Sequence, residues 1–161
     1  MLKYMNTEVV MAEVPDEISL AINLSNCPHH CEGCHSPWLW EDEGTLLDKG
    51  EFLSLLKKND GITCVLFMGG DNDLSSLQYL AYLAKLEGLK VAWYSGLERF
   101  PFDDEAYEYF NYVKLGPYIK ERGGLDNPNT NQMFLSVHRL NGKWVIKDET
   151  KRFQRNNETE N

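Results

Sequence analysis

The sequence predicts an α/β fold in which parallel strands and helices form an incomplete (βα) barrel, followed by a C-terminal β-hairpin. Short apolar, β-branched runs alternate with amphipathic helical patterns, which is typical of a parallel sheet with crossover helices. Near the end of the chain, Asn141-Gly142 separates two strand-like runs, as in a two-residue hairpin turn. The length of 161 residues suits one domain but is too short for a complete barrel.

The expected strands are the runs richest in apolar and β-branched residues, at positions 18–24, 62–68, 90–94 and 112–115. The first helical pattern, LDKGEFLSLLKKN, begins at Asp48, a good N-cap, and places Phe52, Leu55 and Leu56 on one face. The second, DLSSLQYLAYLAKLEG, ends at Gly88, which can adopt the left-handed conformation that stops a helix. A short acidic helix, DDEAYEYF, is expected before the last of these strands.

The remaining third of the chain contains a long loop, GPYIKERGGLDNPNTNQ, and the hairpin FLSVHRLNGKWVIKD. A loop of this length inside a small domain is a candidate for function. We expect residues 1–150 to form a single domain and residues 151–161 to be a polar, disordered tail.

Composition excludes several classes of function. The net charge of −9 repels nucleic-acid phosphates, so nucleic acid is not an expected partner. No apolar run approaches the roughly 20 residues that span a bilayer, and the first residues carry acids where a secretory signal is basic and then apolar. We therefore expect a cytoplasmic protein with no membrane contact, in which clustered thiols bind metal rather than form disulfides.

The stretch CPHHCEGCHSPWLW places Cys27, Cys31 and Cys34 in one loop directly after the first expected strand. Three thiolates from one loop suit zinc or an iron–sulfur cluster. A closed zinc site needs a fourth protein ligand, whereas three is the right count for a [4Fe–4S] cluster with one iron left open. The candidates for a fourth zinc ligand are His30, His35, Cys64 and His138.

The ends of the other expected strands also carry groups suited to ligand binding. Gly69-Gly70-Asp71 follows the second strand, Ser95-Gly96 follows the third, and Lys114 lies near the end of the fourth. Because the carboxyl ends of parallel strands meet at one edge of a sheet, we expect these residues to face one cavity together with the cysteines.

The Cys-x3-Cys-x2-Cys spacing after a first strand resembles the signature of the radical S-adenosylmethionine superfamily. The resemblance implies a [4Fe–4S] cluster on Cys27, Cys31 and Cys34, with S-adenosyl-L-methionine on the open iron. The MGGD stretch is similar to the family's Gly-Gly-Glu motif, which implies that Asp71 binds the amino group of the cofactor. The remaining residues that it implies for cofactor binding are Gly33, His35, Gly69, Gly70, Ser95 and Lys114.

Two stretches of the sequence resemble the activases of glycyl-radical enzymes, in particular those that activate anaerobic ribonucleoside-triphosphate reductases. They are CPHHCEGCHSPWLW and YVKLGPYIKERGGLDNPNTNQMF. This resemblance covers roughly residues 18–134. It implies an oxidoreductase that installs a glycyl radical in a large partner enzyme and receives electrons from a donor such as flavodoxin or ferredoxin. Gly123, Gly124, Asn131 and Gln132 are the candidates for positioning the glycine loop of the partner.

Other interpretations of these residues stay open at this point. The target could be another glycyl-radical enzyme or a small molecule, or the chain could be a non-catalytic zinc module. Asp71 could simply cap the helix that starts near Leu74, Ser95 could be a turn residue, and Lys114 could face solvent. We expect His29 and His30 to be exposed loop residues. We expect Cys64, the fourth cysteine of the chain, to be buried as a small hydrophobic residue.

Overall fold

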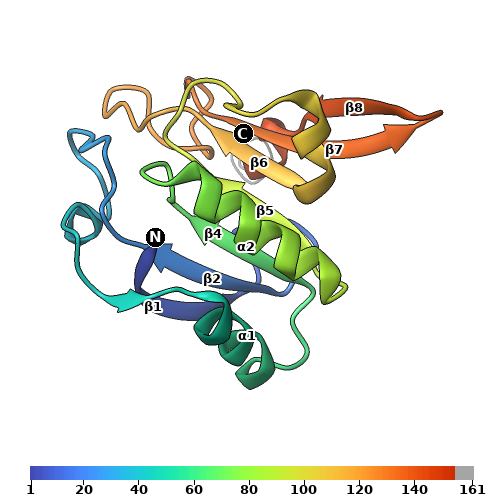
Figure 1. Ribbon diagram of the computed structural model, residues 1–161. Coiled ribbons are helices and arrows are strands. Elements are labelled where there is room, and N and C mark those ends of the chain that lie inside the picture. Colours follow the sequence, from blue (N-terminus) through green and yellow to red (C-terminus); the bar gives the residue numbers. More distant parts are fainter. Residues whose placement is uncertain (155–161) are drawn as a thin grey trace.

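The computed structural model describes residues 1–154 and shows one twisted sheet with helices packed on it (Figure 1). The α-helices are α1 (Lys49–Lys58) and α2 (Leu74–Leu86), and three short 3-10 helices are η1 (Pro37–Leu39), η2 (Asp104–Tyr109) and η3 (Thr150–Phe153). The strands are β1 (Lys3–Val10), β2 (Ser19–Leu24), β3 (Thr45–Leu46), β4 (Cys64–Met68), β5 (Lys90–Tyr94), β6 (Tyr112–Leu115), β7 (Met133–Leu140) and β8 (Lys143–Asp148).

The described chain forms one eight-stranded sheet in the order β3-β1-β2-β4-β5-β6-β7-β8. The four central strands, β2, β4, β5 and β6, are parallel, and they are the four strands that the sequence predicts. On both sides of this centre the pairing is antiparallel, between β1 and its neighbours and between β7 and its neighbours. The sheet is therefore mixed.

The expectation of an incomplete (βα) barrel is wrong. Antiparallel β1 pairs with the outer edge of β2, and antiparallel β7 pairs with the outer edge of β6, so the parallel strands do not curl towards each other. Only α1 and α2 are α-helices among the described residues, fewer than a ring of crossover helices requires. The fold is a small open mixed sheet, and its C-terminal hairpin is confirmed, with Asn141 and Gly142 at φ of 51° and 76°.

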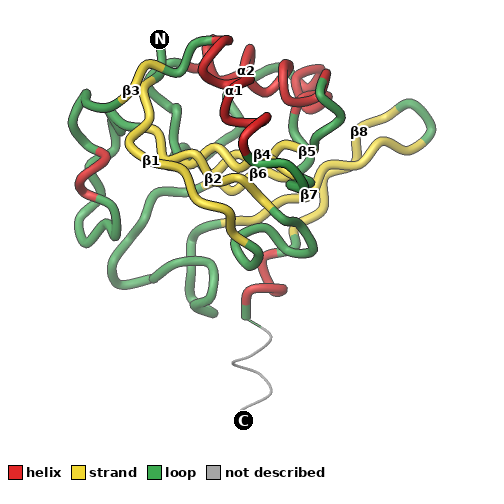
Figure 2. The backbone as a smooth tube through the Cα atoms, turned by 90° about the horizontal axis from the view of Figure 1, so that it is seen from below, coloured by secondary structure: helices red, strands yellow, loops and turns green. Residues whose placement is uncertain are grey.

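The sheet separates two layers (Figure 2). The helices cover one face, while the other face is covered by loops and by η3. Alternation along the strands matches this arrangement, because Ile22, Phe67 and Trp93 lie in the core under the helices, whereas Leu66 and Ala92 lie in the core on the loop side.

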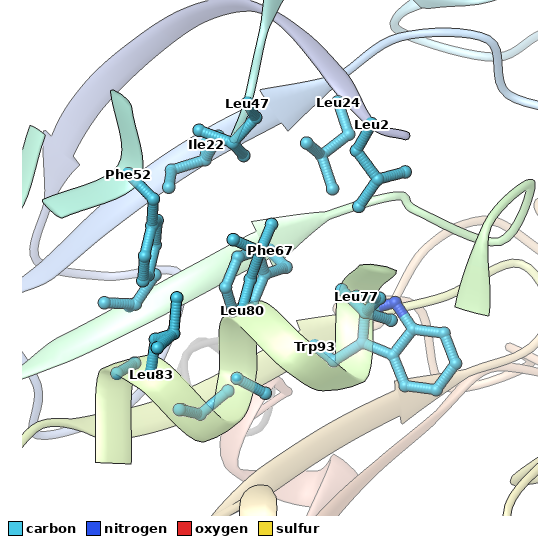
Figure 3. Packing of buried hydrophobic residues seen from close by; sticks show 14 of the residues in the cluster. Leu2, Ile22, Leu24, Leu47, Phe52, Phe67, Leu77, Leu80, Leu83 and Trp93 are labelled. Carbon is cyan, nitrogen blue, oxygen red and sulfur yellow. The ribbon is translucent and has the colours of Figure 1, made fainter. Parts of the chain in front are cut away.

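The larger core lies between the sheet and the two α-helices (Figure 3). Phe52 of α1 stacks on Phe67 of β4, with ring centroids 5.9 Å apart, and Leu77 and Leu80 of α2 are also buried. Burying one such side chain stabilises the fold by about 1.5–3 kcal/mol. This packing fixes the helices on β2, β4 and β5, whose carboxyl ends carry the candidate site.

The helix boundaries follow from local chemistry. Asp48 caps α1, as expected, by accepting a hydrogen bond from the Glu51 N–H. Asp73 caps α2 through the N–H and the hydroxyl of Ser76, and Gly88 lies just beyond α2 with φ of 78°. Because Asp73 occupies the N-cap position of α2, Asp71 does not cap this helix.

The start of the expected disordered tail forms η3 instead. Phe153 packs edge-on against buried Phe134 of β7, and the side-chain amide of Gln154 donates to the carbonyls of Leu125 and Asn127. The rest of the expected tail, residues 155–161, lies outside the described residues.

Candidate functional site

A cavity of about 270 Å³ lies where the loops after β2, β4, β5 and β6 meet. Cys27, Cys31 and Cys34 from the loop after β2 line it together with Asp71 and Ser95. These groups lie far apart along the chain and meet because the carboxyl ends of the parallel strands share one edge of the sheet.

The cavity brings together most of the residues that the sequence singles out. Its walls include Cys27, Cys31, Cys34, His35, Gly69, Asp71, Ser95 and Lys114. Two expected residues lie beside it rather than on it. Gly33 packs against Tyr118 and Lys120, and Gly70 packs against Leu24 and Leu77 behind the turn.

Asp71 is the centre of a hydrogen-bond network at the floor of the cavity. Its carboxylate accepts from the Ser95 hydroxyl at 2.9 Å, from the Gly96 N–H at 2.9 Å and from Nε2 of His29. The Asp71 side chain is only 2% exposed. It does not cap α2, so the alternative of a simple helix cap is wrong, and its three donors hold a negative charge at a fixed point in the cavity.

The turn after β4 depends on its two glycines. Gly69 and Gly70 have φ of 102° and 96°, which side chains rarely tolerate. A Cβ on Gly70 would lie 3.1 Å from Leu24 and 3.2 Å from Leu77. The Gly69 carbonyl accepts a 2.8 Å hydrogen bond from the indole of Trp93, which ties the turn to the next strand and places Asp71 beside Ser95.

Lys114 is the cation among the residues that line the cavity. Burial lowers the pKa of Lys114 below its ordinary value, and the negative charges of Asp71 and of the loop thiolates partly oppose this shift. The side chain thus faces the cavity, and the alternative that it points to solvent is wrong. A partly buried ammonium group suits an anionic partner such as a carboxylate.

The cysteine loop presents thiols that are not bound to each other. None of Cys27, Cys31 and Cys34 forms a disulfide, and all three are partly exposed to the cavity side. Burial raises the pKa of Cys27, while the backbone N–H groups of His29 and His30 act in the opposite direction by hydrogen bonding to its sulfur. Backbone donors of this kind also stabilise the sulfur of a metal-bound thiolate.

The donors fit an iron–sulfur cluster in their chemistry. Three soft sulfur ligands on one loop face a cavity that already holds a carboxylate and a cation for a charged ligand. In the part of the chain that the structure describes, no group of three or more His, Cys, Asp or Glu side chains is placed to hold a single metal ion.

Three of the four candidates for a fourth zinc ligand do not line the cavity, and the fourth, His35, packs there against Tyr118. His30 stacks on Trp40 and His35 packs edge-on against Tyr118, with ring centroids 4.7 Å and 5.2 Å apart. Cys64 is fully buried at the opposite end of β4, as expected for a small hydrophobe, and His138 bonds to Ser136 in the hairpin. This arrangement disfavours a closed four-ligand zinc site.

Sequence reasoning missed several residues on the cavity. His29, expected to be an exposed loop residue, is 21% exposed and bonds to Asp71 across 42 positions of sequence. Tyr94 and Tyr118 also line the cavity. Because side chains alternate between the two faces of a strand, the sequence of β5 already indicates that Tyr94 lies on the loop side of the sheet. No local feature of the sequence indicates the contact of His29 with Asp71.

The four candidates for positioning a partner loop divide into two pairs. Gly124 and Gln132 line the cavity, whereas Gly123 lines a neighbouring hollow beside His35 and Tyr118. Asn131 donates to the Pro117 carbonyl at 3.0 Å, and its buried Oδ1 has no hydrogen-bond partner among residues 1–154.

Comparison with family models, with curated proteins and with solved structures gives no match for this chain. The described residues contain no helix that is both long enough and apolar enough to cross a membrane.

Proposed function

We propose that this protein is a radical S-adenosylmethionine activase, which installs a glycyl radical in a large partner enzyme, most simply an anaerobic ribonucleoside-triphosphate reductase. The observation that carries the proposal is the gathering of Cys27, Cys31 and Cys34 with Asp71, Ser95 and Lys114 around one cavity. Soft ligands for a cluster and charged groups for an amino acid lie within the same small volume.

The proposal assigns each group a task. Cys27, Cys31 and Cys34 hold a [4Fe–4S] cluster and leave one iron for the cofactor. Asp71, held by Ser95, accepts the amino group of the cofactor. When bound, the cluster supplies the electron that splits S-adenosylmethionine into methionine and a 5′-deoxyadenosyl radical, which removes a hydrogen atom from the target glycine.

Lys114 and the glycine turn complete the binding of the cofactor. Lys114 pairs with the carboxylate of the methionine part, because it is the cation among the residues that line the cavity. Gly69 and Gly70 let the backbone pass close to the ligand. A ligand carrying both an ammonium and a carboxylate therefore meets a group of opposite charge for each of them in the same cavity.

The open sheet supports a protein substrate. Gly124 and Gln132, in the long loop between β6 and β7, line the same cavity as the cysteines, so a segment of a partner that touches this loop also reaches the reacting groups. An electron donor such as flavodoxin or ferredoxin would supply the reducing equivalent. These partners belong to the proposal.

Anaerobic reconstitution with iron and sulfide tests the proposal. The reconstituted protein, reduced with dithionite, should convert S-adenosylmethionine to methionine and 5′-deoxyadenosine, and with the partner reductase it should give the electron paramagnetic resonance signal of a glycyl radical. Cys34→Ser should lose both activities. Cys64→Ala is the matched control, because Cys64 is buried away from the cavity, and it should keep both.

Three outcomes would contradict the proposal. One is a colourless protein with one zinc and no iron, which would favour the zinc module. Another is cofactor cleavage that survives Cys34→Ser. The third is cleavage without any radical on a glycyl-radical enzyme, which would favour a small-molecule substrate.

A further inference from the structure

The long loop between β6 and β7 contributes to two neighbouring hollows at consecutive residues. Gly124 lines the cavity, and Leu125 lines a second hollow of about 380 Å³ beside it. The two hollows adjoin each other, because Tyr94, Lys114 and Gln132 are walls of both. The position of the loop at Gly124 and Leu125 therefore affects the shape of both hollows.

Hydrogen bonds within the loop give it a shape of its own. The Asn127 N–H donates to the Gly124 carbonyl at 3.1 Å, and the Thr130 N–H donates to the Asn127 carbonyl at 3.0 Å. The Arg122 side chain donates to the Asn129 carbonyl at 2.9 Å. These bonds join residues of the same loop, so they do not determine where the loop lies relative to the sheet.

Gln154, which follows η3, ties the loop to the C-terminal segment of the described chain. Its side-chain amide donates to the carbonyls of Leu125 and Asn127, at 3.1 Å each. A glutamine amide has two N–H donors, so each of them can serve one carbonyl. Because Gln154 is distant in sequence from both carbonyls, these bonds hold the loop from outside.

The segment that carries Gln154 is itself anchored on β7. The Phe134 N–H donates to the Thr150 hydroxyl at 2.9 Å, and the Glu149 N–H donates to the Phe134 carbonyl at 2.8 Å. Phe153 packs on the buried ring of Phe134, with ring centroids 4.9 Å apart. Since β7 pairs with β6, the anchor belongs to the same sheet that carries the cavity.

The groups assigned to the cofactor are held by other parts of the chain. The three cysteines lie on the loop after β2, and Lys114 lies in β6. Asp71 is bonded to Ser95, Gly96 and His29, all of which precede β6 in the sequence. A shift of the long loop therefore changes one wall of the cavity and leaves the contacts of Asp71 in place.

We propose that Gln154 is a positioning residue for the protein substrate: it holds the long loop at Leu125 and Asn127, so that Gly124 lies where a segment of the partner enters the cavity. This inference rests on the proposed function for the identity of the partner. It gives the C-terminal segment, which the sequence predicts to be a disordered tail, a task in binding that partner.

Hydrogen exchange in cluster-free protein tests the tie without cofactor or partner. Gln154→Met keeps the approximate size of the side chain and removes both donors. Exchange of the backbone amides of residues 124–130, followed by mass spectrometry, should become faster by about tenfold, a factor within the range for losing two hydrogen bonds of ordinary net strength. Gln154→Glu should accelerate exchange further, because a carboxylate would face two carbonyl oxygens. Unchanged exchange in Gln154→Met would overturn the inference.

Arg152→Ala is the matched control. Arg152 lies in the same segment, but its ion pair joins η3 to Asp16, in the turn after β1, rather than to the long loop. This variant keeps the bonds between η3 and Phe134, and exchange in residues 124–130 should stay within about twofold of the wild type. An equal acceleration in Arg152→Ala and Gln154→Met would overturn a specific role of Gln154.

Kinetics with the partner reductase test the consequence for the substrate. In reconstituted protein, Gln154→Met should raise the KM for the reductase in glycyl-radical formation by about fivefold with kcat unchanged, because it weakens a binding contact and alters no reacting group. Cleavage of S-adenosylmethionine without the reductase should match the wild type, and Arg152→Ala should match it in both assays. An unchanged KM in Gln154→Met, or an equal rise in Arg152→Ala, would overturn the role in positioning the substrate.

The exchange measurement separates this inference from the proposed function. Unchanged loop exchange in Gln154→Met would overturn the inference alone if the wild type still installs the glycyl radical. Faster loop exchange in a protein that takes up no iron would leave the tie between Gln154 and the loop standing and would overturn the proposed function.

Discussion

Replacing Asp71 by alanine removes the acceptor at the centre of the cavity floor. The Ser95 hydroxyl and the Gly96 N–H would then lack their partner in a buried setting, whereas His29 can turn towards solvent. Each buried donor left unpaired costs about 1–3 kcal/mol, so Asp71→Ala should lower the free energy of unfolding by about 4 kcal/mol. Asp71→Asn keeps the shape and an acceptor for Gly96, and should cost about 1 kcal/mol.

Urea unfolding of cluster-free protein, followed by circular dichroism, measures these differences. Asp73→Ala is the control, because Asp73 lies two residues away and does not line the cavity. It caps α2 and pairs with the N-terminal ammonium of Met1, and these two contacts together are worth about 1–2 kcal/mol. In reconstituted protein, both Asp71 variants should bind S-adenosylmethionine at least about tenfold more weakly, and Asp73→Ala should bind it normally. If Asp71→Ala were no less stable than Asp73→Ala, the network described around Asp71 would be refuted.

Three further predictions concern the walls of the cavity and the sheet. Because burial lowers the pKa of Lys114 in the folded protein, the free energy of unfolding of the wild type should rise as the pH approaches 10.5, the ordinary lysine value. In urea unfolding, Lys114→Met should lose this rise and be at least as stable as the wild type at pH 7, yet it should bind the cofactor more weakly. The same pH slope in wild type and variant would contradict the burial of the ammonium. Gly70→Ala should destabilise the protein by about 1 kcal/mol more than Gly61→Ala. Both glycines have a similar positive φ, but of the two only Gly70 has atoms within 4 Å of an added Cβ. Equal melting temperatures of the two variants would contradict this packing. Burial raises the pKa of Cys64 to about 12. A disulfide reagent at pH 8 should therefore label the three loop thiols of folded, cluster-free protein and react with Cys64 only after unfolding. Rapid labelling of all four thiols would contradict the burial of Cys64.

The centre of the fold could be predicted from the sequence because its signals are local. The apolar runs of β4 and β5 and the capping residue Asp48 are recognisable within a few positions, and their order fixes the parallel strands. The two-residue turn at Asn141 and Gly142 predicts the hairpin in the same way.

The edges of the sheet could not be predicted in this way. β1 has no buried residue within its bounds and lacks a clear alternation, so nothing local shows that it pairs antiparallel with β2. β7 does alternate, but hydrogen bonding to β6 leaves no mark on its sequence. These two pairings decide that the sheet stays open, and the expectation of a barrel failed at this point.

The site shows the same division. Asp71, Ser95 and Lys114 could be placed together because each follows or ends a parallel strand, and such ends converge. His29 could not, because its partner is distant in sequence and the bond depends on how the cysteine loop folds back. The alternative that Asp71 caps α2 also stayed open in the sequence, and the structure shows that Asp73 is the cap.

The most direct test of the account is the electron paramagnetic resonance spectrum of the anaerobically reconstituted, reduced protein, recorded with and without S-adenosylmethionine. The account predicts a reduced [4Fe–4S] signal whose shape changes when the cofactor is added, because the fourth iron is free to bind it, and it predicts that Cys34→Ser removes this response. A spectrum that the cofactor leaves unchanged, or a protein that binds zinc in place of iron and sulfide, would contradict it.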